Sequence, residues 1–223
     1  MYKTYVMHYK PLAKRYEFVN NELTKMDITD AEFITEFDKE ELSDDIVSRH
    51  YDKSPELRSE QAQISMREGE AYEYETLSIS SISLNMKHIS AFRKFIEQEQ
   101  EFAVFLEDDC EFLDTLHTIE GVIKNAPKNW DVIFLGGAFD HGIVKPLARI
   151  DGYILADHPA SNTTSSILYK KESVKKMMPH LEPFSLPIDW QINHAMYKAE
   201  LNVYHIYPYL CTQGRFRSTA KDE

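Results

Sequence analysis

Short, unbroken apolar runs alternate along this chain with segments in which apolar residues recur at helical spacing. The clearest run, 102–106, has the length and the β-prone residues of a strand buried on both faces, as in a parallel sheet. Helical spacing over 83–99 predicts a helix that leads into this strand, with Ser83 as its cap. The same patterns predict further strands over 4–9, 31–37, 130–137, 152–157, 165–169 and 202–210, and further helices over 14–26, 113–125 and 171–181.

Two stretches show neither pattern. Residues 48–83 are polar and contain Pro55 and Gly69, so short helices or a mobile excursion are expected there. Residues 141–151 are expected to form a loop. The chain of 223 residues fits one large domain or two small ones and can bury a substantial core.

Three acids stop the central apolar run: Glu107, Asp108 and Asp109. In open α/β sheets, ligands bind just beyond the carboxyl ends of the strands. Adjacent carboxylates repel each other unless a divalent cation or hydrogen bonds offset their charge. Such oxygen ligands suit Mg²⁺ or Mn²⁺, which usually share their coordination with a substrate phosphate. The stretch therefore predicts a metal–diphosphate site, and the alternative is a solvated acidic turn.

The charge and cysteine content exclude several classes of protein. A net charge of −12 makes a duplex or RNA partner held by phosphate contacts unexpected. Cys110 and Cys211 are the only cysteines, so a reducing compartment is the default. The first ten residues lack the apolar region of a signal peptide, and no run approaches the roughly 20 apolar residues that span a bilayer. We expect a cytoplasmic protein.

Other functional candidates have simpler structural interpretations. Lys14 and Arg15 follow the first strand, where a phosphate could lie, but a solvated basic first turn is the preferred interpretation. Asp189 stands near the start of a helix, where an acid is a favourable cap. The chain contains neither a Gly-x-Gly-x-x-Gly dinucleotide motif after a strand nor a P-loop. The remaining candidates are His205 for a metal shell and Lys87, Arg215 and Arg217 for phosphates.

Several motifs together resemble one enzyme family. They are a helix with Asn-Met-Lys-His (85–88), Leu-Glu-Asp-Asp (106–109), Trp-Asp-Val-Ile-Phe-Leu-Gly (130–136) and Pro-Ile-Asp-Trp (187–190), followed by a late Gln213 and Ser218. In this order and spacing the chain resembles glycosyltransferase family 25, which contains lipooligosaccharide and collagen galactosyltransferases. The resemblance covers nearly the whole chain, which predicts a single domain over 1–223 with a poorly covered insertion at about 48–83.

The resemblance implies a nucleotide-sugar-binding, GT-A-like α/β fold whose mixed, mostly parallel sheet is flanked by helices. It implies inverting transfer of a hexose from a UDP-sugar to an acceptor hydroxyl on a glycan. Carried over by position, Asp109 and Glu107 are the metal ligands for Mn²⁺ or Mg²⁺, and Glu107, Asp108, Lys87 and His88 line the nucleotide side. Lys87 stands where the family has Ser, and residues 80–83 replace its usual Gly-Glu-Ile-Gly run.

Inverting transfer needs a base for the attacking hydroxyl and a metal for the departing diphosphate. Asp189 is the candidate base, because it lies on a separate segment from the acids at 107–109. Two other classes remain open. Paired carboxylates also serve metal-dependent hydrolases of sugars or phosphate esters, and the same fold could bind a sugar nucleotide without catalysis.

Overall fold

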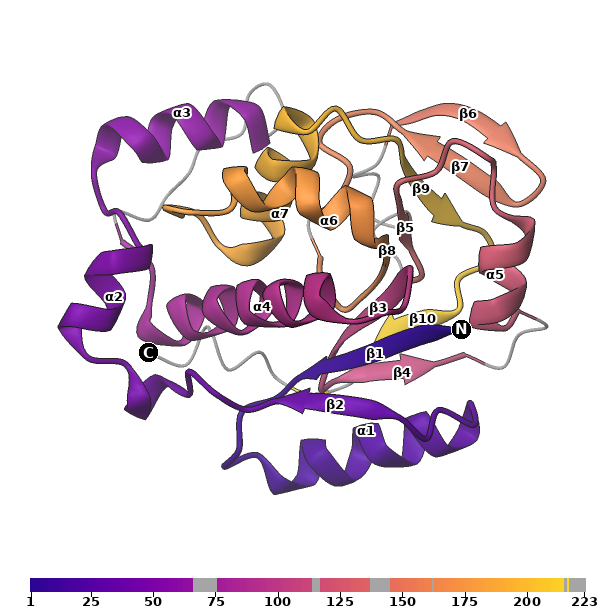
Figure 1. Ribbon diagram of the computed structural model, residues 1–223, viewed down its shortest axis with the longest axis horizontal. Helices are drawn as coiled ribbons and strands as arrows, with labels where there is room; N and C mark the ends of the chain where they lie inside the picture. Colours follow the sequence, from indigo (N-terminus) through magenta and orange to yellow (C-terminus); the bar gives the residue numbers. More distant parts are fainter. Residues whose placement is uncertain (66–75, 114–116, 137–144, 162, 215, 217–223) are drawn as a thin grey trace.

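An eight-stranded mixed sheet organises the computed structural model, which describes residues 1–65, 76–113, 117–136, 145–161, 163–214 and 216 (Figure 1). Its strands lie in the order β2-β1-β3-β8-β5-β9-β7-β6, and the pairings show that β8 and β7 run opposite to the others. The expected α/β class with a mixed, mostly parallel sheet flanked by helices is confirmed. The strands are β1 (Tyr2–Met7), β2 (Ala31–Ile34), β3 (Phe102–Glu107), β5 (Val132–Phe134), β6 (Pro146–Ile150), β7 (Tyr153–Ala156), β8 (Ser166–Lys170) and β9 (Val203–Ile206).

Helices cover both faces of the sheet (Figure 1). One core lies under α4 (Ile79–Glu97), α6 (Lys171–Met177) and α7 (Ile188–Lys198). The other lies under α1 (Ala13–Lys25) and α5 (Ile119–Asn125), together with a two-stranded sheet of β4 (Cys110–Phe112) and β10 (Cys211–Gln213). The remaining helices are α2 (Asp44–His50), α3 (Pro55–Ser65) and the short 3₁₀ helices η1 (Lys39–Glu41) and η3 (Met178–His180).

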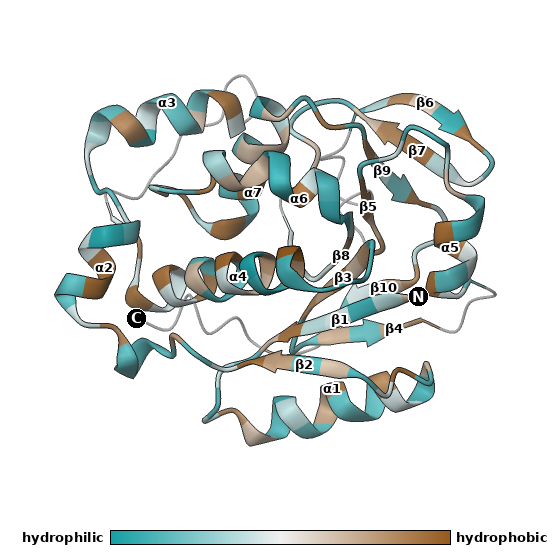
Figure 2. Cartoon of the chain, in the orientation of Figure 1, coloured by the Kyte–Doolittle hydropathy of each residue, from teal (hydrophilic) through white to brown (hydrophobic). Residues whose placement is uncertain are grey.

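The central strand β3 is buried on both faces, as its apolar run predicts. Ala103 and Phe105 point into one core and Val104 and Leu106 into the other, and all four side chains are fully buried. This is the period-two alternation of a strand between two helical layers. Figure 2 shows β5 uniformly hydrophobic inside the sheet, whereas the outer helix α1 carries residues of both kinds.

Several element boundaries differ from the sequence-based expectations. Helix α4 begins at Ile79, and its cap is Ser78 rather than Ser83, because Ser78 Oγ accepts the Ser81 N–H. Of the helix expected over 113–125, the described residues are helical only over Ile119–Asn125, and residues 114–116 lie outside the described part. Just before it, Cys110–Phe112 form β4 against β10. The strand expected over 202–210 ends at Ile206, and the chain pairs again only in β10.

The two stretches without a clear pattern contain regular elements. The expected loop at 141–151 contains the edge strand β6. Most residues of β6 are exposed, so its sequence does not show the apolar pattern of a buried strand. The segment at 48–83 contains α3 and the start of α4, and residues 66–75 of it lie outside the described part. None of the helices that the structure describes is long and apolar enough to cross a membrane.

Candidate active site at the carboxyl ends of β1 and β3

The parallel pairing of β1 and β3 brings two polar segments to one edge of the sheet. Met7 pairs with Glu107, so His8 and Asp108 follow side by side. Strand β8 runs the other way and begins at this edge, where the Glu107 N–H donates to Ser165 O at 3.0 Å. The carboxyl ends of strands are the usual binding edge of an open α/β sheet. The three acids therefore lie where the sequence places them.

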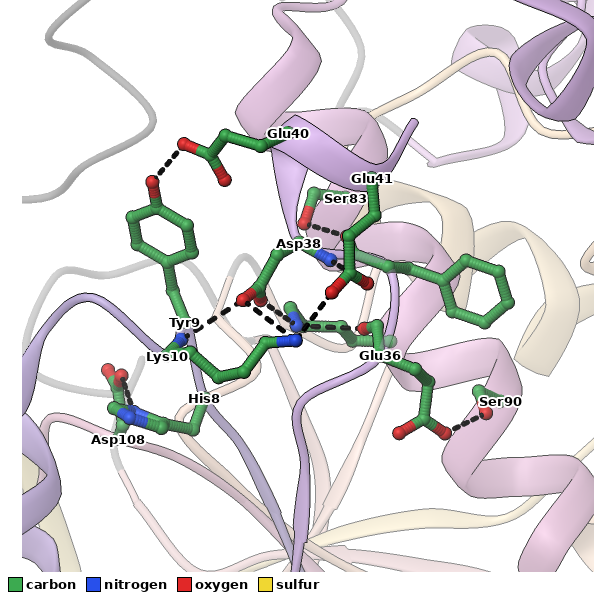
Figure 3. Close-up of polar contacts among 12 residues, drawn as sticks. His8, Tyr9, Lys10, Glu36, Asp38, Glu40, Glu41, Ser83, Ser90 and Asp108 are labelled. Atoms are coloured by element: carbon green, nitrogen blue, oxygen red, sulfur yellow. Dashed lines mark hydrogen bonds and ion pairs between the residues drawn. The ribbon is translucent and has the colours of Figure 1, made fainter. Parts of the chain in front are cut away.

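Asp108 is held by two partners on both sides of its carboxylate. His8 Nδ1 lies 2.7 Å from Asp108 Oδ2 (Figure 3). Arg15 Nη1 donates to Asp108 Oδ1 at 2.8 Å, from the first turn of α1. Asp108, His8 and Arg15 are all buried. Each oxygen of the Asp108 carboxylate therefore has a buried partner within the protein.

One carboxylate oxygen of Asp109 has no hydrogen-bond partner within the described part of the chain. Its Oδ2 lies 3.3 Å from Arg15 Nη1 and 3.4 Å from Gln213 Nε2. Its Oδ1 is buried, and none of the described residues donates a hydrogen bond to it. Burial raises the pKa of Asp109, and the positive charge of Arg15 opposes that rise. Such an orphaned anionic oxygen is what a metal ion or a donor group would satisfy.

Glu107 is the most accessible of the three acids, with 18% of its side chain exposed. The Thr164 hydroxyl donates a short hydrogen bond to Glu107 Oε1. Burial is the largest cause that raises the pKa of Glu107 to about 8, and repulsion from Asp109 is the next. The charge of Asp189 adds to the rise. A dication beside these acids would reverse the effect by favouring both ionised forms.

Asp189 lies in the first turn of α7, half-buried, and within electrostatic reach of Glu107. The N-cap of α7 is Pro187, so Asp189 is not the capping residue. Its Oδ1 accepts the Trp190 N–H at 3.0 Å. Burial raises the pKa of Asp189 to about 6. An acid with a pKa close to neutrality suits proton transfer, because it is ionised at pH 7 and still basic.

His88 lies behind Glu107 on α4 and is fully buried. Burial lowers its pKa to about 3, so the imidazole is neutral. Its Nε2 lies 4.0 Å from Glu107 Oε1, which is too long for a hydrogen bond. No partner for either ring nitrogen is found in the described part of the chain. A small rotation of Glu107 would satisfy one of them.

Lys87 points away from the acids, into a second cluster at the end of β2. Its Nζ donates to Asp38 Oδ1 at 2.6 Å and to Glu36 O at 2.8 Å. Lys87 and Asp38 are both buried, and burial lowers the pKa of Lys87 while Asp38 opposes this. Asp38 also accepts the Lys10 N–H at 3.3 Å, and Figure 3 shows this cluster beside the His8–Asp108 pair. The ammonium of Lys87 thus donates its hydrogen bonds to groups of the protein itself.

The carboxyl-terminal segment passes directly over Asp109. The Gly214 N–H donates to Asp109 O at 2.6 Å, and a Cβ at Gly214 would lie 2.7 Å from that oxygen. The Phe216 ring packs against Phe18, with centroids 5.1 Å apart, and over the Arg15 guanidinium at 5.3 Å. Only glycine allows this close approach of two backbones. Residues near the two ends of the chain therefore complete one site.

The solvated-turn interpretation of Arg15 is wrong, because its guanidinium is buried between two carboxylates. For Lys14 the same interpretation agrees with the structure, because its side chain is exposed. His205 lies in β9, stacked on Phe134 with its Nε2 2.8 Å from Ala160 O. Arg215 and Arg217 lie outside the described residues. The role of Arg15 was hard to predict, because the two carboxylates that it contacts lie 93 and 94 positions away along the sequence.

Asp109 and Glu107 fit a divalent cation shared with a diphosphate. No group of three or more acids, histidines or cysteines arranged for a metal occurs among the described residues. Mg²⁺ sites often use only one or two carboxylates, and substrate phosphates and water complete the shell. The unsatisfied Asp109 Oδ1 and the partly exposed Glu107 supply such a pair.

No family model matches the chain, and no curated protein matches it. Similar solved structures include a glycosyltransferase involved in glycosylation of the major capsid of PBCV-1, at 10% identity over 98% of this chain and 95% of that one, with a TM-score of 0.47. The galactosyltransferase LgtC, solved with donor and acceptor sugar analogs, matches at 8% identity over 96% and 87%, with a TM-score of 0.45. A mutant Drosophila beta-1,4-galactosyltransferase 7, solved with manganese, UDP-Gal and xylobiose, matches at 11% identity over 96% and 68%, with a TM-score of 0.41.

Proposed function

We propose that this protein is a glycosyltransferase that moves a hexose from a UDP-sugar to a hydroxyl of a glycan acceptor, with inversion. The observation that carries the proposal is that acids from two separate segments lie within electrostatic reach of each other. Glu107 is the last residue of the central strand β3 and Asp109 follows it, and Asp189 in the first turn of α7 acts on the charge of Glu107. The motifs that resemble glycosyltransferase family 25 include these residues, which supports the same assignment.

The acids at the end of β3 would act on the leaving diphosphate, and Asp189 would act on the acceptor hydroxyl. Glu107 and Asp109 would hold Mn²⁺ or Mg²⁺, which when bound supplies Lewis-acid stabilisation to the departing diphosphate. Asp189 Oδ takes the proton of the acceptor hydroxyl as that oxygen bonds to the anomeric carbon. The bond from that carbon to the phosphate oxygen breaks, and its electron pair leaves with UDP. The acceptor must therefore approach from the α7 side, opposite the donor.

His88 and Lys87 have different places in this proposal. His88 is a neutral group whose Nε2 lies 4.0 Å from Glu107 Oε1, and it can steady that carboxyl when Glu107 rotates toward the imidazole. Lys87 supports the wall at the end of β2 by neutralising Asp38, so its part on the nucleotide side is indirect. Asp108 likewise acts on the site through Arg15.

An acceptor-dependence assay tests the proposal directly. UDP-glucose and UDP-galactose are incubated with Mn²⁺, with and without a panel of glycan acceptors, and UDP release is measured. Release that requires an acceptor supports a transferase. Equal release in water alone would identify a hydrolase, and UDP binding without release on any acceptor would identify a binding protein. Stronger inhibition by GDP than by UDP would refute the nucleotide assignment.

A further inference from the structure

The acids at the end of β3 already have a cation beside them. Arg15 Nη1 lies 2.8 Å from Asp108 Oδ1 and 3.3 Å from Asp109 Oδ2, so one guanidinium bridges two carboxylates. Arg15 is 9% exposed, and its charge cannot be screened by bulk water as a surface arginine's would be. The repulsion among the acids is therefore offset inside the protein itself.

Arg15 is fixed in this position from three sides. Asp108 accepts its hydrogen bond while His8 holds the other oxygen of the same carboxylate at 2.7 Å. The Phe216 ring lies over the guanidinium at 5.3 Å, a cation–π contact. The backbone of Arg15 belongs to the first turn of α1. The guanidinium therefore stays beside Asp109 when a ligand arrives.

A fixed positive charge beside Asp109 changes what this carboxylate can bind. It repels a metal cation that approaches without other ligands, because like charges interact strongly at short range in a buried site. It attracts a diphosphate, whose oxygens then add negative charge and metal ligands at the same place. The attraction of this site for Mn²⁺ is therefore stronger when the nucleotide is present.

We propose that Arg15 is a positioning residue that makes metal binding depend on the diphosphate. It takes up Asp109 Oδ2 and leaves Oδ1 as the oxygen of Asp109 that is open to the metal, and metal binding becomes firm only when a nucleoside diphosphate has entered. This inference rests on the proposed function, because it assigns the diphosphate and the metal to the same site.

Lys14 provides a matched control for this proposal. It is the neighbour of Arg15 in the first turn of α1 and carries the same charge, but its side chain is exposed. Arg15→Gln removes the charge and keeps a group that can donate a hydrogen bond to Asp108. Lys14→Gln makes the same change in net charge away from the carboxylates.

The test measures binding of Mn²⁺ alone by electron paramagnetic resonance and calorimetry, for the unmodified protein and both variants, and then repeats it with saturating UDP. For the unmodified protein, UDP should tighten Mn²⁺ binding by at least about tenfold. Arg15→Gln should bind Mn²⁺ alone at least about tenfold more tightly than Lys14→Gln, which should stay within about twofold of the unmodified protein. Thermal melting of each variant establishes that it is folded.

Two results would overturn the inference. If a folded Arg15→Gln variant binds Mn²⁺ alone no more tightly than Lys14→Gln, the charge of Arg15 does not weaken metal binding, and the inference is refuted. If the unmodified protein binds Mn²⁺ equally well with and without UDP, metal binding does not depend on the diphosphate, and the inference is refuted. This measurement does not require the Arg15→Gln variant to fold. Neither result uses sugar transfer, so a failed transferase assay refutes the proposed function separately.

Discussion

Replacing Lys87 by methionine separates a structural role from nucleotide binding. Lys87 and Asp38 have side chains only 3% and 4% exposed, and their charged atoms lie 2.6 Å apart. Removing one partner of a buried ion pair leaves an uncompensated charge and typically costs about 3–5 kcal/mol. Asp38 retains the Lys10 N–H at 3.3 Å and the Lys10 ammonium at 3.7 Å, so the lower value, about 3 kcal/mol, is expected here.

The stability loss can be measured by urea unfolding and by thermal melting, where about 3 kcal/mol corresponds to roughly 6–12 °C in a chain of this size. Lys94→Met is the control on the same helix: Lys94 is 38% exposed and pairs with Glu32 and Glu36 at 2.9 and 3.1 Å. Because exposed pairs are screened by solvent, that variant should lose less than about 1 kcal/mol. Adding Asp38→Asn to Lys87→Met should restore much of the loss, since the unpaired charge is removed.

The opposite pattern would refute this reasoning. If Lys87→Met unfolds like Lys94→Met and instead weakens UDP binding, the ammonium serves the nucleotide and the ion pair contributes little. Titration of UDP into the two variants, followed by the change in fluorescence or heat, gives the second quantity. Unchanged UDP affinity with a large loss of stability confirms the structural role.

Three further predictions concern the site itself. Asp189→Asn should lower kcat by about 10²–10⁴ with nearly unchanged UDP-sugar affinity; because the base must be ionised, kcat of the unmodified protein should fall as the pH drops through about 6, and the variant should lose that limb. Asp109→Asn and chelation by EDTA should each abolish turnover without unfolding the protein, and undiminished activity in chelator would exclude the metal. Gly214→Ala should cost about 1–3 kcal/mol and weaken UDP binding, because its Cβ would lie 2.7 Å from Asp109 O, whereas Gly121→Ala in α5 should stay close to the unmodified protein.

The parts of the fold that were predictable are those with a strong local pattern. The apolar run at 102–106 became β3 because it is buried on both faces, and the helical spacing before it became most of α4. Strand β6 was missed, since an exposed edge strand has no buried face, and β4 and β10 are only three residues each. A pattern needs a buried side and several residues to be visible.

Within the candidate site, the sequence indicated the three consecutive acids as a group but not the partners that hold them. Glu107, Asp108 and Asp109 stand together in the sequence and at one edge of the sheet. Arg15 was not assigned to them, because its partners are 93 and 94 residues away and sequence spacing gives no measure of that contact. Lys87 and His88 are adjacent, but neighbouring helical residues point about 100° apart, so one faces Asp38 and the other Glu107.

Gln213, Gly214 and Phe216 lie against Asp109 and Arg15, and this affects how the protein should be handled in the laboratory. The Phe216 ring lies over the Arg15 guanidinium, with their centres 5.3 Å apart. A tag or truncation close to Phe216 is therefore expected to disturb the cover of Arg15. Met1 is fully exposed, and β1 begins only at Tyr2. A cleavable tag before Met1 lies at the opposite end of β1 from the candidate site and should leave that site unaltered.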